Sequence, residues 1–171
     1  MATNKNEVPP FEIVADCLKR SCDFLAARIE PCSDWPRMLI LANQAGCTVE
    51  PLDDYLTGDS ERDQDLLRNG LLPQLARRVN ARIAGLLLPA WFIDPADDPD
   101  HLHHGGSVIQ HPLRRECINL LLVEANRAEA WMAEVERHPR QSPTLGAWIG
   151  PCETGGAMVD ALQRGVRAKE A

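Results

Sequence analysis

The most apolar stretch of the chain is Ala81-Arg-Ile-Ala-Gly-Leu-Leu-Leu-Pro-Ala-Trp-Phe-Ile93, and the next is Cys117-Ile-Asn-Leu-Leu-Leu-Val123. Short, nearly continuous apolar runs are typical of strands that are buried on both faces. The segment between them, 94–111, is polar and contains four histidines, four aspartates, two prolines and two glycines. The sequence therefore predicts two core strands joined by a long loop, and this loop is the first place to look for a functional site.

Helical and strand-like patterns precede these two strands. Apolar residues recur every three or four positions over 10–30, which predicts an amphipathic helix. Two short apolar runs flank Asn43-Gln-Ala-Gly46, which predicts a β-hairpin over 37–52. Thr57-Gly-Asp-Ser60 precedes acidic residues, as at a helix start, and Gly70 and Pro73 predict that this helix is kinked or broken.

The segment 117–138 fits two secondary structures. Its content of Leu, Ala, Glu and Arg favours a helix. Residues 118–123, however, are apolar on both faces and are β-branched at both ends, which favours a hairpin that turns near 125–127. We prefer the hairpin, although the pattern alone leaves the helix open. Farther on we expect a short strand at 145–149, a loop at 150–156 and a small helix or tail at 157–169.

Together these elements predict an α+β fold in a single domain that spans residues 1–171. We expect about five strands in a mainly antiparallel sheet, with two main helices packed on one face. Residues 1–9 and about 157–171 are expected to be peripheral or mobile. A chain of this length buries roughly 70% of its unfolded surface, so it needs no disulfide or metal ion in order to fold.

The formal net charge of −7 restricts the classes of partner. A nucleic-acid-binding protein usually needs a basic face, and so does a protein that adsorbs to anionic membranes, so we expect neither partner. No apolar run reaches the roughly 20 residues of a membrane-spanning helix, and the first ten residues do not have the pattern of a signal peptide. Six cysteines are too few for a disulfide scaffold, which favours a cytoplasmic protein with free thiols.

Three motifs carry a resemblance to known proteins. Ala90-Trp91 ends the first core strand, Ser107-x-x-x-His111-Pro112-x-Arg114-x-Glu116 leads into the second, and Leu145-Gly-x-Trp148 follows. With these motifs the chain resembles a set of small, largely uncharacterised bacterial and phage α+β proteins, from the first helix to about Trp148. The resemblance implies the order helix, hairpin, helix, strand, hairpin. It carries no chemistry that could be transferred to these residues.

The histidines of the loop could bind a metal ion. Imidazole and carboxylate groups are ligands for zinc and other divalent metals, and alternation along an extended segment puts His101 and His103 on one side. The alternative function is therefore a metal-dependent hydrolase that uses His101, His103, His104 and His111. The simpler interpretation is a solvated loop that holds no cofactor.

A second set of residues could bind a protein partner. An exposed tryptophan beside an acidic rim is a candidate anchor, because Trp is often enriched at interfaces. An arginine could clamp a carboxylate or a phosphate bidentately, or pair with a nearby acid of the loop. The candidate partner-binding residues are Trp91, His111, Arg114, Arg115 and Trp131.

The function that these observations favour is a non-enzymatic interaction or accessory domain that binds a protein partner or a second copy of itself. A narrower version is a phage- or plasmid-encoded inhibitor that acts on a protein of its host. No nucleophile elbow, phosphate-binding loop or dinucleotide fingerprint is present in the sequence. We therefore name no catalytic residue.

The two functions differ in their metal content. If the loop is solvated, protein purified without an affinity tag contains no stoichiometric metal, and chelator leaves its melting temperature unchanged. Elemental analysis and thermal melts of wild type and of the double variant His101→Ala/His103→Ala measure this. Near one metal per chain, lost together with several degrees of melting temperature in the double variant, would instead favour the hydrolase.

Overall fold

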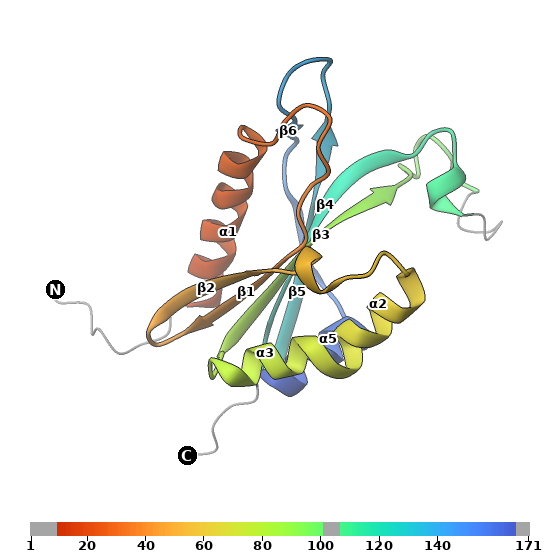
Figure 1. Cartoon of the computed structure of the whole chain (residues 1–171). Helices are drawn as coiled ribbons and strands as arrows, with labels where there is room; N and C mark the ends of the chain where they lie inside the picture. Colours follow the sequence, from red (N-terminus) through yellow and green to blue (C-terminus); the bar gives the residue numbers. More distant parts are fainter. Residues whose placement is uncertain (1–9, 101–106, 167–171) are drawn as a thin grey trace, which may run out of the picture.

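The computed structural model describes residues 10–100 and 107–166 (Figure 1). Its helical elements, in chain order, are α1 (Phe11–Ala26), η1 (Asp53–Tyr55), α2 (Ser60–Leu66), η2 (Leu67–Leu71), α3 (Leu72–Arg78), η3 (Val108–Gln110) and α5 (Ala157–Gly165). Its strands are β1 (Met38–Asn43), β2 (Gly46–Pro51), β3 (Ile83–Phe92), β4 (Arg115–Glu124), β5 (Arg127–Glu136), β6 (Thr144–Leu145) and β7 (Ile149–Glu153). The expected α+β fold with an antiparallel sheet is confirmed.

The strands form one curled antiparallel sheet in the order β2-β1-β3-β4-β5-β6, with β7 also paired to β5. The two apolar stretches form its centre, since β3 and β4 pair with each other without a break in register from Ala84–Val123 to Phe92–Arg115. The segment 117–138 is a hairpin, because β4 pairs with β5 as far as Glu124–Arg127. The strand interpretation of this segment is therefore confirmed.

The sheet has two more strands than the five expected, because 144–153 contains two short strands, β6 and β7, in place of one strand at 145–149. β6 pairs with Val135 and Glu136, whereas β7 pairs with 129–132, where a shift in register interrupts the ladder. The segment 150–156, expected to be a loop, supplies most of β7. Proline and glycine are tolerated there because β7 lies at the edge of the sheet.

Helices cover both faces of the sheet, not one as expected (Figure 1). Alternate residues of β1 point to opposite sides: Ile40 packs in the cluster beneath α1, while Leu41 packs in the cluster beneath α3 and α5. The same alternation holds along β3 and β4. Strands that are apolar on both faces must be covered on both, since exposing either face would leave a large apolar surface in water.

The C-terminal helix belongs to the core, although we expected 157–171 to be peripheral. Val159, Leu162 and Val166 of α5 and its end are nearly inaccessible to solvent, with exposed fractions of 5, 0 and 1%. They recur at intervals of three and four residues, so they form one stripe against α3 and the sheet. Residues 1–9 and 167–171 lie outside the described part of the chain.

The helix expected to be kinked or broken near Gly70 is continuous from Ser60 to Arg78, but it contains one π-helical segment, η2. There the Leu72 N–H donates to the Leu67 carbonyl, five residues earlier. Pro73 follows immediately and has no N–H to donate to the preceding turn. A widened turn next to proline is a recognised way for a helix to absorb that loss.

α5 packs so closely on α3 that Gly165 has no room for a side chain. A Cβ atom added at this position would lie 2.6 Å from the Cβ of Ala76 and 3.1 Å from the Cα of Pro73. We therefore expect Gly165→Ala to lower the free energy of unfolding by about 1–3 kcal/mol, despite the better helix propensity of alanine. Chemical denaturation measures this change.

Gly155→Ala is the matched control, because a Cβ atom there would meet nothing within 4 Å. We expect it to change stability by less than about 0.5 kcal/mol. Equal stability of the two variants would contradict the packing of α5 on α3.

The link between η1 and α2 is closed by the carboxylate of Asp63, which is 5% exposed. This carboxylate accepts hydrogen bonds from the Thr57 N–H and hydroxyl, both at 2.8 Å, and from the Gly58 N–H at 2.9 Å. These bonds, the one from the Thr57 N–H above all, lower the pKa of Asp63. The carboxylate in its ionised form therefore holds the start of α2 in place.

A pKa lowered on folding means that the stabilisation is complete above the unfolded pKa of about 3.9 and is lost as the pH falls through the folded pKa. We expect Asp63→Asn to be clearly less stable than wild type at pH 7, and the difference to shrink as the pH falls below about 4. Urea denaturation at several pH values measures it. Asp65→Asn removes an equal charge from an exposed carboxylate whose one hydrogen-bonded partner among the described residues is the Asn69 side chain, so a similar effect there would contradict the assignment.

Candidate functional site

The candidate site lies where the central hairpin extends beyond the rest of the sheet. β1 pairs with β3 only as far as Leu87, whereas β4 accompanies β3 to Phe92. The ends of β3 and β4 and the described part of their connection therefore project from the body as an arm, which we define as residues 88–100 and 107–116 (Figure 1). Along this arm, one edge of β3 pairs with no other strand of the described residues.

Trp91 is the most conspicuous side chain of the arm, because 43% of it is exposed. The guanidinium of Arg114 lies over its ring, 4.9 Å from the centroid, and also donates to the Ile109 carbonyl. Ile109 and Leu113 are themselves 66% and 48% exposed. The arm thus presents three large apolar side chains and a cation to solvent, and exposed apolar surface that is contiguous often marks an interaction site.

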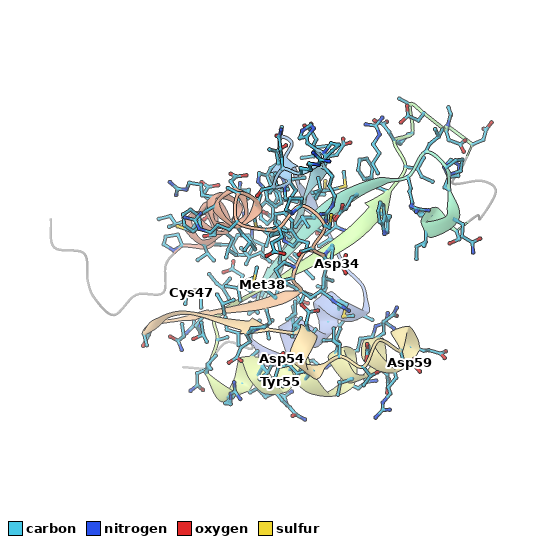
Figure 2. All side chains as sticks on the ribbon, turned by 45° about the horizontal axis from the view of Figure 1, so that its top comes forward. Asp34, Met38, Cys47, Asp54, Tyr55 and Asp59 are labelled. Carbon is cyan, nitrogen blue, oxygen red and sulfur yellow. The ribbon has the colours of Figure 1, made fainter. Side chains whose placement is uncertain are left out.

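A hollow of about 500 Å³ lies beside Trp91 at the base of the arm. Its walls come from three parts of the chain: the segment before β1, η1, and the facing ends of β3 and β4. Asp34, which Figure 2 labels, lies on one wall. The lining residues are Asp34, Trp35, Pro36, Arg37, Asp53, Pro89, Ala90, Trp91 and Glu116.

Two ion pairs hold the walls of this hollow. Arg37 donates to the carboxylate of Asp53 from its side chain at 2.8 Å and from its backbone at 3.1 Å. Arg137 forms two hydrogen bonds with the carboxylate of Glu116, at 2.5 and 2.7 Å, which raise the pKa of this arginine. Such bidentate pairs fix geometry as well as charge.

Arg137 also reaches the loop between α1 and β1, where it donates to the Ser33 carbonyl at 3.0 Å. It thereby ties the start of β4 to the segment that carries Asp34. Asp34 itself is exposed and makes no hydrogen bond among the described residues, although its charge lies close enough to Arg137 to contribute to the raised pKa of that arginine. The hollow therefore keeps one carboxylate available to a basic group of a partner.

Of the two arginines proposed for partner binding, Arg114 is exposed and Arg115 is held inside the arm. Arg115 donates to Asp97 at 2.5 Å and to Glu134 at 3.4 Å, and the hydrogen bond with Asp97 is the main reason that its pKa is raised. Arg115 thus positions the loop after β3 against β5. It is less suited than Arg114 to meet a partner.

His111 has a similar role at the base of the loop. Its Nε2 lies 3.0 Å from a carboxylate oxygen of Asp98, and its Nδ1 accepts from the Leu113 N–H at 3.2 Å. His111 therefore links the two sides of the arm. The other three histidines of the alternative metal site, His101, His103 and His104, lie outside the described residues, and the described part of the chain contains no group of three or more metal-binding side chains.

Trp131, the fifth residue proposed for partner binding, is not available to a partner, because only 5% of it is exposed. It packs beneath α1, with its ring 6.4 Å from that of Phe11 and the ammonium of Lys19 5.4 Å from its centroid. The sequence predicted the residue type of an interface but not the direction of the side chain on β5.

The buried cysteines do not suit a nucleophilic role. Burial raises the pKa of the Cys117 thiol to about 11 and that of Cys22 to about 12. The thiolate is the reactive form, so both groups are poor nucleophiles near neutral pH.

No protein-family model, curated protein or solved structure matches this chain. The resemblance to small bacterial and phage proteins therefore stays a prediction. Within residues 10–100 and 107–166, no helix is long and apolar enough to cross a membrane.

Proposed function

We propose that this protein is a non-enzymatic interaction domain and that it binds a protein partner through the arm and the hollow at its base. The observation that carries the proposal is an exposed Trp91 beside a hollow that is lined by an exposed carboxylate, Asp34. Tryptophan and arginine are the residues most often found at the energetic centre of protein interfaces, and here Trp91 and Arg114 lie one above the other.

The partner is expected to insert a side chain, not to add a strand. β3 has a free edge along the arm, but Pro89 lies in that stretch and supplies no N–H for a new ladder. The hollow, in contrast, offers apolar walls from Trp91, Pro36 and Pro89. An apolar side chain next to a lysine or arginine fits it, because the basic group would meet Asp34.

We place this interaction in the cytoplasm. All six cysteines have free thiols, and none forms a disulfide with another. A reducing compartment maintains this state. A narrower form of this proposal is that the protein is an inhibitor encoded by a phage or a plasmid. It requires the partner to be a protein of the host, so identifying the partner tests this form as well.

The proposal predicts that replacement of Trp91 weakens binding. A photo-crosslinking amino acid at position 91, in the cells that make the protein, identifies the partner by mass spectrometry. With that partner purified, we expect Trp91→Ala to weaken binding at least about tenfold by calorimetry, which corresponds to about 1.4 kcal/mol. An adduct between two copies of the chain would identify the partner as the protein itself.

Phe24 provides a matched control. It is 61% exposed, and the guanidinium of Arg28 lies 3.2 Å from its ring centroid, so it is another arginine-covered aromatic residue, on a helix. We expect Phe24→Ala to change the affinity by less than twofold. The proposal fails if the purified partner binds the two variants equally well, or if crosslinkers at positions 91 and 24 capture the same proteins.

A further inference from the structure

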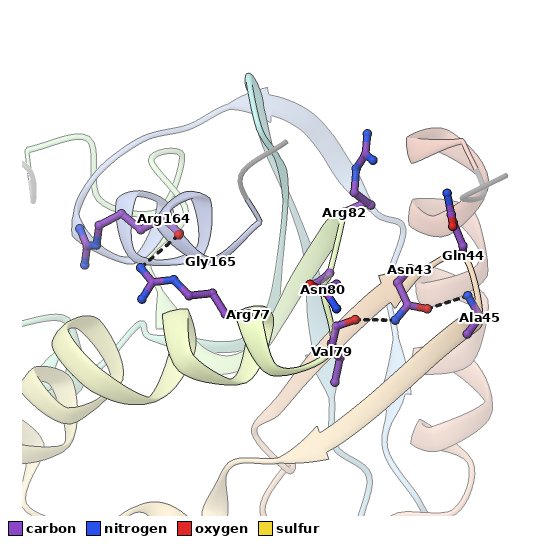
Figure 3. A pocket seen from close by; sticks show the side chains of 10 residues that line it. Asn43, Gln44, Ala45, Arg77, Val79, Asn80, Arg82, Arg164 and Gly165 are labelled. Atoms are coloured by element: carbon purple, nitrogen blue, oxygen red, sulfur yellow. Dashed lines mark hydrogen bonds between the residues drawn. The ribbon is translucent and has the colours of Figure 1, made fainter. Parts of the chain in front are cut away.

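A second hollow lies at the other end of β1 and has a different chemistry. It has a volume of about 710 Å³, and the turn between β1 and β2, the end of α3, the start of β3 and the end of α5 surround it (Figure 3). Its lining residues are Asn43, Gln44, Ala45, Arg77, Val79, Asn80, Ala81, Arg82, Arg164 and Gly165. We propose that this hollow, which we call the arginine hollow, binds a small, multiply charged phosphate compound.

The charge of the lining is the first argument. Three of the ten residues are arginines and none is acidic, although acids outnumber bases by 25 to 18 in the whole chain. The neighbouring Arg78, which is not part of the lining, has its own carboxylate partner, Glu50, at 2.7 Å. A concave surface with charges of one sign raises the local concentration of the opposite ion, even on a protein whose net charge has that opposite sign.

The donors that remain available are the second argument. The guanidinium of Arg82 makes no hydrogen bond or ion pair within residues 10–100 and 107–166. Arg77 uses one nitrogen to donate to the Arg164 carbonyl at 3.3 Å, and most of its five N–H groups have no partner in the part of the chain that the structure describes. Arg164 donates to the Arg68 carbonyl at 2.8 Å. We therefore expect it to attract the anion through its positive charge and not through a hydrogen bond.

The hollow lies at the C-terminal end of α3, and free carbonyl groups at a helix C-terminus would repel an anion. Here several of these carbonyl groups already accept hydrogen bonds. Asn80 takes a positive φ of 52°, and the Ala81 N–H donates back to the Ala76 carbonyl at 2.9 Å. This arrangement caps carbonyl groups of the last turn. The Val79 carbonyl is also occupied, because the Asn43 side chain donates to it at 2.6 Å (Figure 3).

The size and the uncharged lining residues narrow the class of ligand. A volume of about 710 Å³ exceeds the needs of one inorganic phosphate and lies within the usual range for small-molecule sites. The lining has no aromatic side chain on which a nucleobase could stack, while Gln44 and Asn80 supply amides. These features favour a compound with two or more phosphate groups over a nucleotide that is recognised through its base.

Isothermal titration of the full-length protein with inorganic phosphate, pyrophosphate and tripolyphosphate tests the proposal. We expect one site per chain and an affinity that rises with the number of phosphates and falls with salt. Arg82→Gln should weaken tripolyphosphate binding at least tenfold, and Arg77→Gln should do the same. Arg78→Gln, which removes an equal charge from the next residue of α3, should change it by less than twofold.

Several results would overturn the proposal. One is an equal loss in Arg82→Gln and Arg78→Gln, which would indicate only a general effect of charge. Another is binding that persists in the Arg77→Gln/Arg82→Gln double variant, which would place the ion elsewhere. A third is binding of a single-stranded oligonucleotide but not of tripolyphosphate. Thermal melts without ligand show that the variants are folded, so loss of binding is not mistaken for loss of structure.

Discussion

The ladder between β3 and β4 extends five residues beyond the ladder between β3 and β1, and the shape of the arm and of the hollow beside Trp91 depends on this difference. β1 pairs with β3 only over 83–87, whereas β4 pairs with β3 over 84–92. The unmatched part of β3 becomes the arm, and the place that β1 would have occupied becomes the hollow beside Trp91. The length of a six-residue strand thus determines where the surface is concave.

The rigidity of these sites comes from the sheet on which they stand. β1, β3 and β4 are buried on both faces, by α1 on one side and by α3 and α5 on the other. Gly85 of β3 allows this packing, because a Cβ atom there would come within 3.1 Å of Leu122 and 3.4 Å of Leu18. A larger residue there would require the end of the Leu122 side chain to shift by a few tenths of an ångström. Side chains at the ends of such a sheet hold their positions because the strands that carry them cannot shift without disrupting two cores.

Local patterns in the sequence predicted the elements better than their arrangement. Alternation and apolar runs are properties of neighbouring residues, so α1, the first hairpin and the strands β3 to β5 could be predicted from them. Because β3 is apolar on both faces, it needs helices on both faces of the sheet. The local sequence, however, does not indicate which helix covers which face. α5 was missed as a core element because its apolar stripe is only Val159, Leu162 and Val166, too short to distinguish from a tail.

The candidate sites show the same limit more clearly. Trp91 and Arg114 could be proposed because they flank a conspicuous loop, yet Trp131, of the same residue type, is buried. Asp34 and Asp53 could not be linked to Trp91, since only the folded chain brings the three together. The arginine hollow gave no signal at all, because Arg77, Arg82 and Arg164 are spread over nearly 90 residues and each fits an ordinary surface position.

The two hollows lie at the two ends of β1, which separates them by roughly 17 Å at a rise of about 3.3 Å per residue. One is lined by three carboxylates and one arginine, and the other by three arginines and no carboxylate. At that distance salt largely screens each set of exposed charges from the other, so each hollow can keep its own charge preference on one small domain. Because β1 is rigid and buried between them, substitutions in one hollow should have independent effects from substitutions in the other. Coupling between them would require β1 to take a second position in the sheet, and the cores on its two faces oppose such a shift.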